Sequence, residues 1–171
     1  MKNFRVFGYD DGYDFIKAVV GESSEDRVMF PAAYSDIRHG NLKGDYIAQG
    51  DFKEDNMVIE FEGQPLYIGK SAIKFDIASG GEKNFTKTKF QDKGAVHKFL
   101  ASVALLTDEK DVEIDNMIVG LSINLYSDYR RQIEDVFRDR KFTFSTQDGQ
   151  KRTVKVNKCK AIPQGIGSYW N

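Results

Sequence analysis

The sequence predicts an α/β fold in which helices pack against a mixed β-sheet. Residues 3–9, 13–20 and 27–33 have the apolar patterning of three strands joined by short turns. Residues 91–107 have the periodicity of a helix, and a second amphipathic segment follows the apolar strand predicted at 115–123. A meander followed by helix, strand and helix is typical of helices packed on a mixed sheet.

The first turn of the meander contains Asp11 and Gly12 between two strand-like segments. Asp-Gly between such segments is a strong hairpin signal, because glycine adopts positive φ without a steric penalty. We therefore predict a hairpin here, with a turn in which Gly12 can adopt positive φ and Asp11 tolerates it.

Residues 34–56 are polar and predicted to be irregular, and residues 57–61 and 66–68 predict a second hairpin. A short helix is predicted at 71–78, followed by a loop at 79–90. We expect the segment from about residue 34 to residue 90 to form a small subdomain, inserted into a core made of residues 1–33 and 91–171.

The helix predicted at 91–107 has an N-cap candidate in Asp92, and His97 lies off its apolar stripe. We therefore expect His97 at the surface. The apolar stripe of this helix consists of Val96, Phe99, Leu100, Val103 and Leu106.

Near the C-terminus, residues 142–146 and 152–156 predict a hairpin around Asp148-Gly149, and residues 159–162 predict a separate short strand.

The composition is that of a soluble globular domain, with 171 residues, 40% hydrophobic and 30% charged. There is no run of about 18 apolar residues to span a membrane, and the N-terminus has no apolar signal-peptide region. Cys159 is the single cysteine, which excludes an internal disulfide and a cysteine-based metal cluster. We expect a cytoplasmic protein.

Basic residues are concentrated in residues 138–160, which contain eight basic and two acidic side chains. The segment therefore carries +6, although the net charge of the chain is −1. Lys151, Thr153 and Lys155 alternate with Val154 and Val156, which favours the solvent-exposed face of a strand. A surface for an acidic partner remains the alternative.

The first hairpin also has residues suited to binding phosphate. Asp10, Gly12 and Lys17 form the pattern Asp-x-Gly-x4-Lys. A tight glycine turn exposes backbone N–H groups to an anion, an aspartate can hold the waters of Mg²⁺, and a lysine neutralises phosphate charge. The pattern alone is unspecific, because it is short and its residues are common.

Five segments make the phosphate interpretation more specific, because they occur in the same order in one family. They are GYDDGYDFIK, MFPAAY, PLYIGKSAI, NMIVGLSINLY and KCKAIPQGIGSYW. Together they resemble the actin-like ATPases, in particular the bacterial plasmid-segregation (ParM/StbA-type) branch. The resemblance covers most of the chain and implies the ribonuclease-H-like, actin-like ATPase fold, with ATP and Mg²⁺ as ligands.

The resemblance also implies roles for individual residues. Asp10 would act on Mg²⁺ through water, and Lys17 would contact phosphate oxygens. The backbone N–H groups of the turn would face the β- and γ-phosphates, and Gln164 would be the catalytic residue that positions the attacking water. The nucleotide-binding residues would be Asp10, Asp11, Gly12, Tyr13, Asp14 and Lys17.

The implied function is an ATP-binding protein that forms filaments and acts in plasmid or DNA segregation. The resemblance implies its own subunits as partners and allows a DNA-bound adaptor, with neither direct nucleic-acid binding nor a membrane. Two other classes remain open. One is a non-enzymatic actin-like interaction module, motivated by the +6 segment. The other is a ribonuclease-H-like nuclease that would use Asp10, Asp11 and Asp14.

The chain departs from the family pattern at three positions. Tyr13 and Asp14 replace the usual small residues of the phosphate turn, and Ser122 replaces a proline. The second phosphate motif, Asp-x-Gly-x-x-Thr, does not occur in the sequence. We therefore expect the N-terminal half of such a protein, excised or naturally short, without the C-terminal half. We expect it to bind ATP weakly or not at all by itself.

Overall fold

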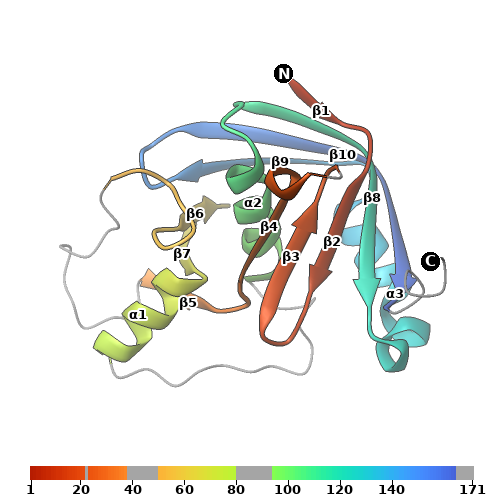
Figure 1. The fold of residues 1–171 in the computed structure, drawn as a ribbon, viewed down its shortest axis with the longest axis horizontal. Helices are drawn as coiled ribbons and strands as arrows, with labels where there is room; N and C mark the ends of the chain where they lie inside the picture. Colours follow the sequence, from red (N-terminus) through yellow and green to blue (C-terminus); the bar gives the residue numbers. More distant parts are fainter. Residues whose placement is uncertain (22, 38–49, 80–93, 165–171) are drawn as a thin grey trace.

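The computed structural model describes residues 1–21, 23–37, 50–79 and 94–164 (Figure 1). Within this part of the chain, ten strands form one sheet in the order β4-β3-β2-β8-β10-β9-β6-β7-β5, and β1 also pairs with β8. The strands are β1 Lys2–Phe4, β2 Phe7–Asp11, β3 Phe15–Val19, β4 Arg27–Pro31, β5 Tyr34–Asp36, β6 Val58–Phe61, β7 Gln64–Ile68, β8 Asp111–Leu121, β9 Arg140–Thr146 and β10 Lys151–Pro163. The helices are α1 Lys70–Ser79, α2 Gly94–Leu106, α3 Ile123–Phe137 and the short 3₁₀ helix Ser24–Asp26.

The predicted N-terminal meander is confirmed. Strands β2, β3 and β4 are antiparallel neighbours, with Asp10 opposite Lys17 and Lys17 opposite Met29. On its other side β2 is parallel to β8, and β8 is parallel to β10. The sheet is therefore mixed, as predicted, and the carboxyl ends of β2, β8 and β10 meet at one edge.

Two strand boundaries differ from the sequence prediction. The strand predicted at 3–9 is divided into β1 and β2, which both pair with β8 in one register, Lys2 opposite Val112 and Phe7 opposite Met117. The strands predicted at 152–156 and 159–162 form one continuous strand, β10. Its burial alternation shifts between Val156 and Cys159, so the pattern suggested a break although the ladder to β8 continues.

Helix α2 is enclosed, because the sheet curves around it (Figure 1). It contacts β3 and β4 on one side and β6 and β7 on the other. His97 is consequently 3% exposed, and its Nε2 donates a hydrogen bond to the Gln64 carbonyl oxygen at 2.9 Å. The expectation of a surface histidine was therefore wrong. The N-cap predicted at Asp92 lies outside the described residues.

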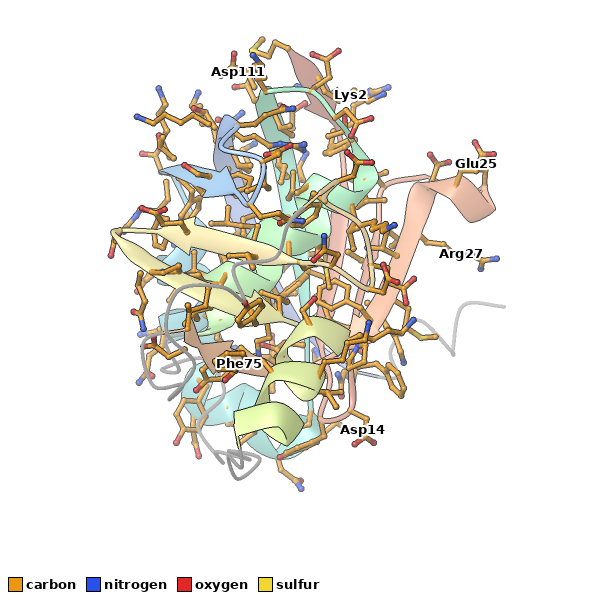
Figure 2. The ribbon with its side chains drawn as sticks, turned by 90° about the vertical axis from the view of Figure 1, so that its left-hand side faces the viewer. Lys2, Asp14, Glu25, Arg27, Phe75 and Asp111 are labelled. Atoms are coloured by element: carbon orange, nitrogen blue, oxygen red, sulfur yellow. The ribbon has the colours of Figure 1, made fainter. Side chains whose placement is uncertain are left out.

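The second predicted hairpin is confirmed as β6 and β7, with Glu62 and Gly63 at positive φ in its turn. Strand β5, at residues predicted to be irregular, pairs with β7, and β6 pairs with β9. This segment therefore continues the main sheet. The predicted short helix is α1, which has a small apolar cluster of its own with β6 and β7 (Figure 2). That cluster consists of Val58, Tyr67, Ala72 and Phe75.

Helices α2 and α3 cover the same face of the sheet, since the rings of Phe99 and Phe137 lie 5.0 Å apart. On the face away from α2 and α3, β3 and β4 expose the apolar side chains of Phe15, Val19 and Met29. No helix in the described ranges is both long and apolar enough to cross a membrane.

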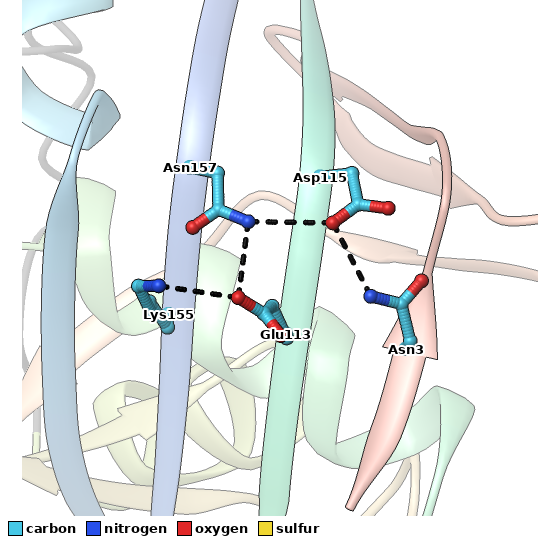
Figure 3. Close-up of polar contacts among 5 residues, drawn as sticks. All are labelled: Asn3, Glu113, Asp115, Lys155 and Asn157. Atoms are coloured by element: carbon cyan, nitrogen blue, oxygen red, sulfur yellow. Dashed lines mark hydrogen bonds and ion pairs between the residues drawn. The ribbon is translucent and has the colours of Figure 1, made fainter.

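A polar network lies on the same open face, across β1, β8 and β10 (Figure 3). Lys155 Nζ pairs with Glu113 at 3.2 Å, and Asn157 Nδ2 donates to Glu113 at 3.1 Å and to Asp115 at 3.3 Å. The hydrogen bond from Asn157 and the Lys155 charge lower the pKa of Glu113. Lys155 thus lies on an exposed strand face, as its alternation with valines predicted, and has an acidic partner within the chain.

Candidate functional site

The candidate site lies where the carboxyl ends of three parallel strands meet. Asp10 is near the end of β2, opposite Gly120 of β8, and Gln164 directly follows β10. In open α/β sheets, ligands bind outside the carboxyl ends of parallel strands, where loops and side chains of several strands converge. Two of the residues implied by the resemblance, Asp10 and Gln164, are therefore brought to this edge from opposite ends of the chain.

Gln164 and Asp10 contact each other directly. Gln164 Nε2 donates a hydrogen bond to Asp10 Oδ1, and the Gln164 backbone N–H donates to the Leu121 carbonyl oxygen at 2.6 Å. A Cβ at position 120 would lie 3.4 Å from Gln164 Cγ and 3.8 Å from Asp10 Cβ. The two side chains therefore meet over Gly120, which leaves the space above the strand open.

Lys17 lies on the same face as Asp10. The two residues are directly opposite each other in the antiparallel ladder between β2 and β3, and paired residues of a ladder project to the same side. Lys17 is exposed. The structure thus places an acidic, a basic and an amide side chain on adjacent strands at one edge of the sheet.

The turn of the first hairpin differs from the prediction in the reason for its glycine. Gly12 is not among the described glycines with positive φ. A Cβ at Gly12 would instead lie 2.6 Å from the Phe15 carbonyl oxygen, so glycine is required for space. The Gly12 N–H donates to that carbonyl at 3.1 Å and is therefore already used within the turn.

Tyr13 and Asp14 form the exposed tip of this hairpin (Figure 2). Tyr13 is 61% exposed, and the Asp14 carbonyl oxygen accepts the Ala32 N–H at 2.9 Å. The two residues that depart from the family pattern are thus tolerated, because their side chains extend into solvent.

Asp11 is not brought to the site face. Its carboxylate is buried on the α2 side of the sheet, where Lys98 Nζ lies 2.9 Å from Oδ2 and 3.0 Å from Oδ1. A contact of Asp11 with phosphate could therefore only involve its backbone. Sequence reasoning missed Lys98, although a lysine between His97 and Phe99 in a strongly apolar helix was a usable signal.

The carboxylates nominated for a nuclease do not converge. Asp10 and Asp11 project to opposite faces, and Asp14 is at the hairpin tip. Within the described ranges, no group of three His, Cys, Asp or Glu residues could hold a metal ion. A two-metal centre needs such a group, whereas Mg²⁺ that keeps its waters needs only one or two carboxylates. Asp10 fits the second case.

The fold and this edge of the sheet define the class as an actin-like α/β domain. A sequence profile described as "Actin like proteins N terminal domain" matches residues 8–167, and the chain belongs to this family. A search of curated protein sequences finds no significant match.

Solved structures support the same fold. The actin-like protein Alp7A superposes with a TM-score of 0.73 at 14% identity, covering 98% of this chain and 46% of that one. The archaeal actin homolog Ta0583 gives 0.70 at 17%, covering 96% and 47%. The plasmid pSK41 ParM protein without nucleotide gives 0.68 at 18%, covering 98% and 51%. The chain therefore spans about half the length of the solved structures it resembles.

Proposed function

We propose that this chain is the N-terminal half of an ATP-binding, filament-forming actin-like protein that acts in plasmid or DNA segregation. The observation that carries the proposal is the placement of Asp10, Lys17 and Gln164 on one edge of the sheet. These are the residues to which the family resemblance gives metal, phosphate and water contacts.

Each residue has a chemical role suited to its place. Asp10 offers a partly exposed carboxylate that would hold Mg²⁺ through water, and Mg²⁺ would neutralise phosphate charge. Lys17 would neutralise phosphate oxygens beside it. Gln164 has an amide that can orient a water near Asp10. The backbone N–H groups of Tyr13 and Asp14 at the exposed tip would approach the β- and γ-phosphates, while the Gly12 N–H holds the turn through Phe15.

Relatives with the same fold support nucleotide binding and self-association. Ta0583 has been solved in complex with ADP, and AlfA as a filament bound to AMPPNP. We extend both properties to this chain as part of the proposal, with its own subunits as the first partner and a DNA-bound adaptor as a second. The division into a core of 1–33 and 91–171 and an inserted subdomain of about 34–90 belongs to the same proposal.

The site can be tested by NMR titration of the 171-residue chain with Mg-ATP. Because the second phosphate motif is missing, we expect a dissociation constant on the order of millimolar, near the weak end of specific binding. Backbone shifts should be confined to residues 10–17, Gly120 and Gln164. Lys17→Ala should remove them, whereas Lys151→Ala, a matched exposed strand lysine, should leave them unchanged.

Two outcomes would contradict the proposal in different ways. Absence of shifts at residues 10–17 would reject the phosphate site. A micromolar affinity measured by calorimetry would reject the view that this chain has only one side of the nucleotide site.

Sedimentation distinguishes the proposed function from the alternative, a non-enzymatic interaction module. Such a module should assemble without nucleotide, whereas the proposed half-domain should stay in the supernatant.

A further inference from the structure

A buried ion pair joins the end of strand β2 to helix α2. Lys98 Nζ lies 3.0 Å from Oδ1 and 2.9 Å from Oδ2 of Asp11, so it contacts both carboxylate oxygens. The side chains of Lys98 and Asp11 are 3% and 1% exposed. The two residues are 87 positions apart in the sequence, so the contact fixes the tertiary arrangement of helix and strand.

The position of Asp11 connects this ion pair to the candidate site. Asp11 is the last residue of β2, between Asp10 and Gly12. Successive side chains of a strand project to opposite faces, so Asp11 enters the α2 side while Asp10 stays on the face of Lys17 and Gln164. The end of β2 is thus held on the α2 side through Asp11 and presents the Asp10 carboxylate on the opposite face.

Asp11 is also the last buried side chain before the turn. Gly12 has no side chain, and Tyr13 and Asp14 are exposed. A rotation of the strand end that displaced Asp10 would also move the Asp11 carboxylate away from Lys98. The ion pair therefore resists the motions that would misplace the turn.

An apolar pair could fill the same space without desolvating two charges. Most of the other buried side chains on the same two elements are apolar, among them Phe7, Phe99 and Ala101. Replacing buried ion pairs by apolar residues is often neutral or stabilising, and the best-attested use of such pairs is to fix a register. A charge-assisted hydrogen bond depends on distance and direction, so the contact with Lys98 restrains the Asp11 carboxylate more strictly than an apolar contact would.

We propose that Lys98 is a positioning residue for the phosphate-binding turn. Through Asp11 it sets the orientation of the strand end, and so the direction of Asp10 and the path of the backbone at Gly12. The proposal rests on the proposed function, because it assigns Lys98 a role at the same site without contact to the ligand.

The test compares Lys98→Met, Asp11→Asn and the double variant with the wild-type chain. The double variant leaves no buried charge unpaired and is therefore expected to fold even if a single variant does not. The first readout needs no nucleotide. Hydrogen exchange of the Gly12 amide should accelerate about tenfold in the double variant, whereas exchange of the Ile68 amide, bonded to Met57 in another part of the sheet, should not change.

The second readout is the NMR titration with ATP in the presence and absence of Mg²⁺. The double variant should lose most of the Mg²⁺-dependent gain in affinity, because that gain depends on the direction of Asp10. A purely structural role would leave the Mg²⁺ dependence unchanged. Lys70→Met is the control, since it breaks the exposed ion pair with Glu54, 2.8 Å long, and should leave both readouts unchanged.

The outcomes separate this proposal from the proposed function. A folded double variant with wild-type Gly12 exchange and wild-type Mg²⁺ dependence would overturn the positioning role. If the wild-type chain shows no shifts with ATP but the variant accelerates Gly12 exchange, Lys98 positions the turn and the nucleotide function fails. If both readouts change as expected, both proposals are supported.

Discussion

Gln164 Nε2 donates a hydrogen bond to Asp10 Oδ1, which joins two residues 154 positions apart. The contact is made possible by parallel pairing, because β8 lies between β2 and β10 and has Gly120 at the level of Asp10. The two strand ends hold both side chains in place before any ligand arrives. The side chain of Gln164 is therefore oriented by Asp10 and by its own backbone bond to Leu121.

Gln164→Ala should change the stability of the chain little, by less than about 1 kcal/mol, because it removes one exposed hydrogen bond. Denaturant unfolding measures this, with Gln132→Ala on exposed α3 as the control. Shifts caused by Mg-ATP at Lys17 should persist, because Gln164 is assigned to water and Lys17 to phosphate. Loss of those shifts would show that Gln164 holds the nucleotide itself.

Gly12→Ala should destabilise the chain by about 1–3 kcal/mol, because the added Cβ would lie 2.6 Å from the Phe15 carbonyl oxygen. Asparagine should not rescue the position, because the restriction there is space. At Gly149, with φ of 76° and nothing within 4 Å of a Cβ, Gly149→Asn should be tolerated, since asparagine adopts positive φ more readily than most residues. Equal effects of the two asparagine variants in thermal unfolding would contradict this distinction.

The local signals of the sequence predicted most of the fold, and the errors have specific causes. The Asp-Gly turn and the flanking apolar residues predicted the β2–β3 hairpin. The exposure of His97 was predicted wrongly, because the sequence of its helix does not reveal that β6 and β7 cover the side of α2 opposite β3 and β4. The freedom of Gly12 to adopt positive φ was the reason that the sequence offered for this glycine, because the actual constraint, a close carbonyl oxygen, depends on the turn as folded.

The candidate site was predictable only in part. Asp10, Lys17 and Gln164 were nominated through the family resemblance, and strand pairing brings them to one edge. Asp11 was nominated with them, but its carboxylate has Lys98 as a partner on the other face. A lysine within an apolar helix could indicate a buried charge, but a pairing across 87 residues has no local signature, so the sequence could not identify Asp11 as its partner.

Tyr9→Phe should raise the free energy of unfolding by about 1 kcal/mol. The Tyr9 hydroxyl is buried and has no hydrogen-bond partner among the described residues, so its removal relieves a desolvation cost. Burial, with smaller contributions from Asp11 and Asp10, also raises the pKa of Tyr9 well above its usual value. Denaturant unfolding at pH 7 measures the change. A loss of stability would indicate a partner outside the described residues.

Stability should fall at alkaline pH in part through Cys159. Burial, and to a lesser degree Glu134, raise the pKa of this thiol from 9.0 to about 12. The folded state therefore favours the neutral thiol, and its contribution is complete below pH 9 and lost as the pH rises toward 12. The loss from this group is up to about 1.4 kcal/mol per pH unit.

The comparison variant for the alkaline prediction is Cys159→Ala, which has no thiol to ionise. Unfolding free energies at pH 8 and at pH 10.5 should differ less for the variant than for the wild type. Tyr9 titrates in the same direction in both proteins, so its effect cancels in the comparison. Identical pH dependence would show that the Cys159 thiol ionises as readily in the folded as in the unfolded chain.

The pairing of β1 with β8 has a consequence for how the protein folds during synthesis. Lys2 pairs with Val112 and Phe7 with Met117, so the first strands remain without their parallel neighbour until β8 has left the ribosome. Non-local pairings of this kind form slowly and leave strand edges exposed meanwhile. The β2–β3–β4 meander can form earlier, because its turns are short. The turn at Gly12 can thus exist on a nascent hairpin, but Asp10 and Gln164 can meet only once β10 is complete.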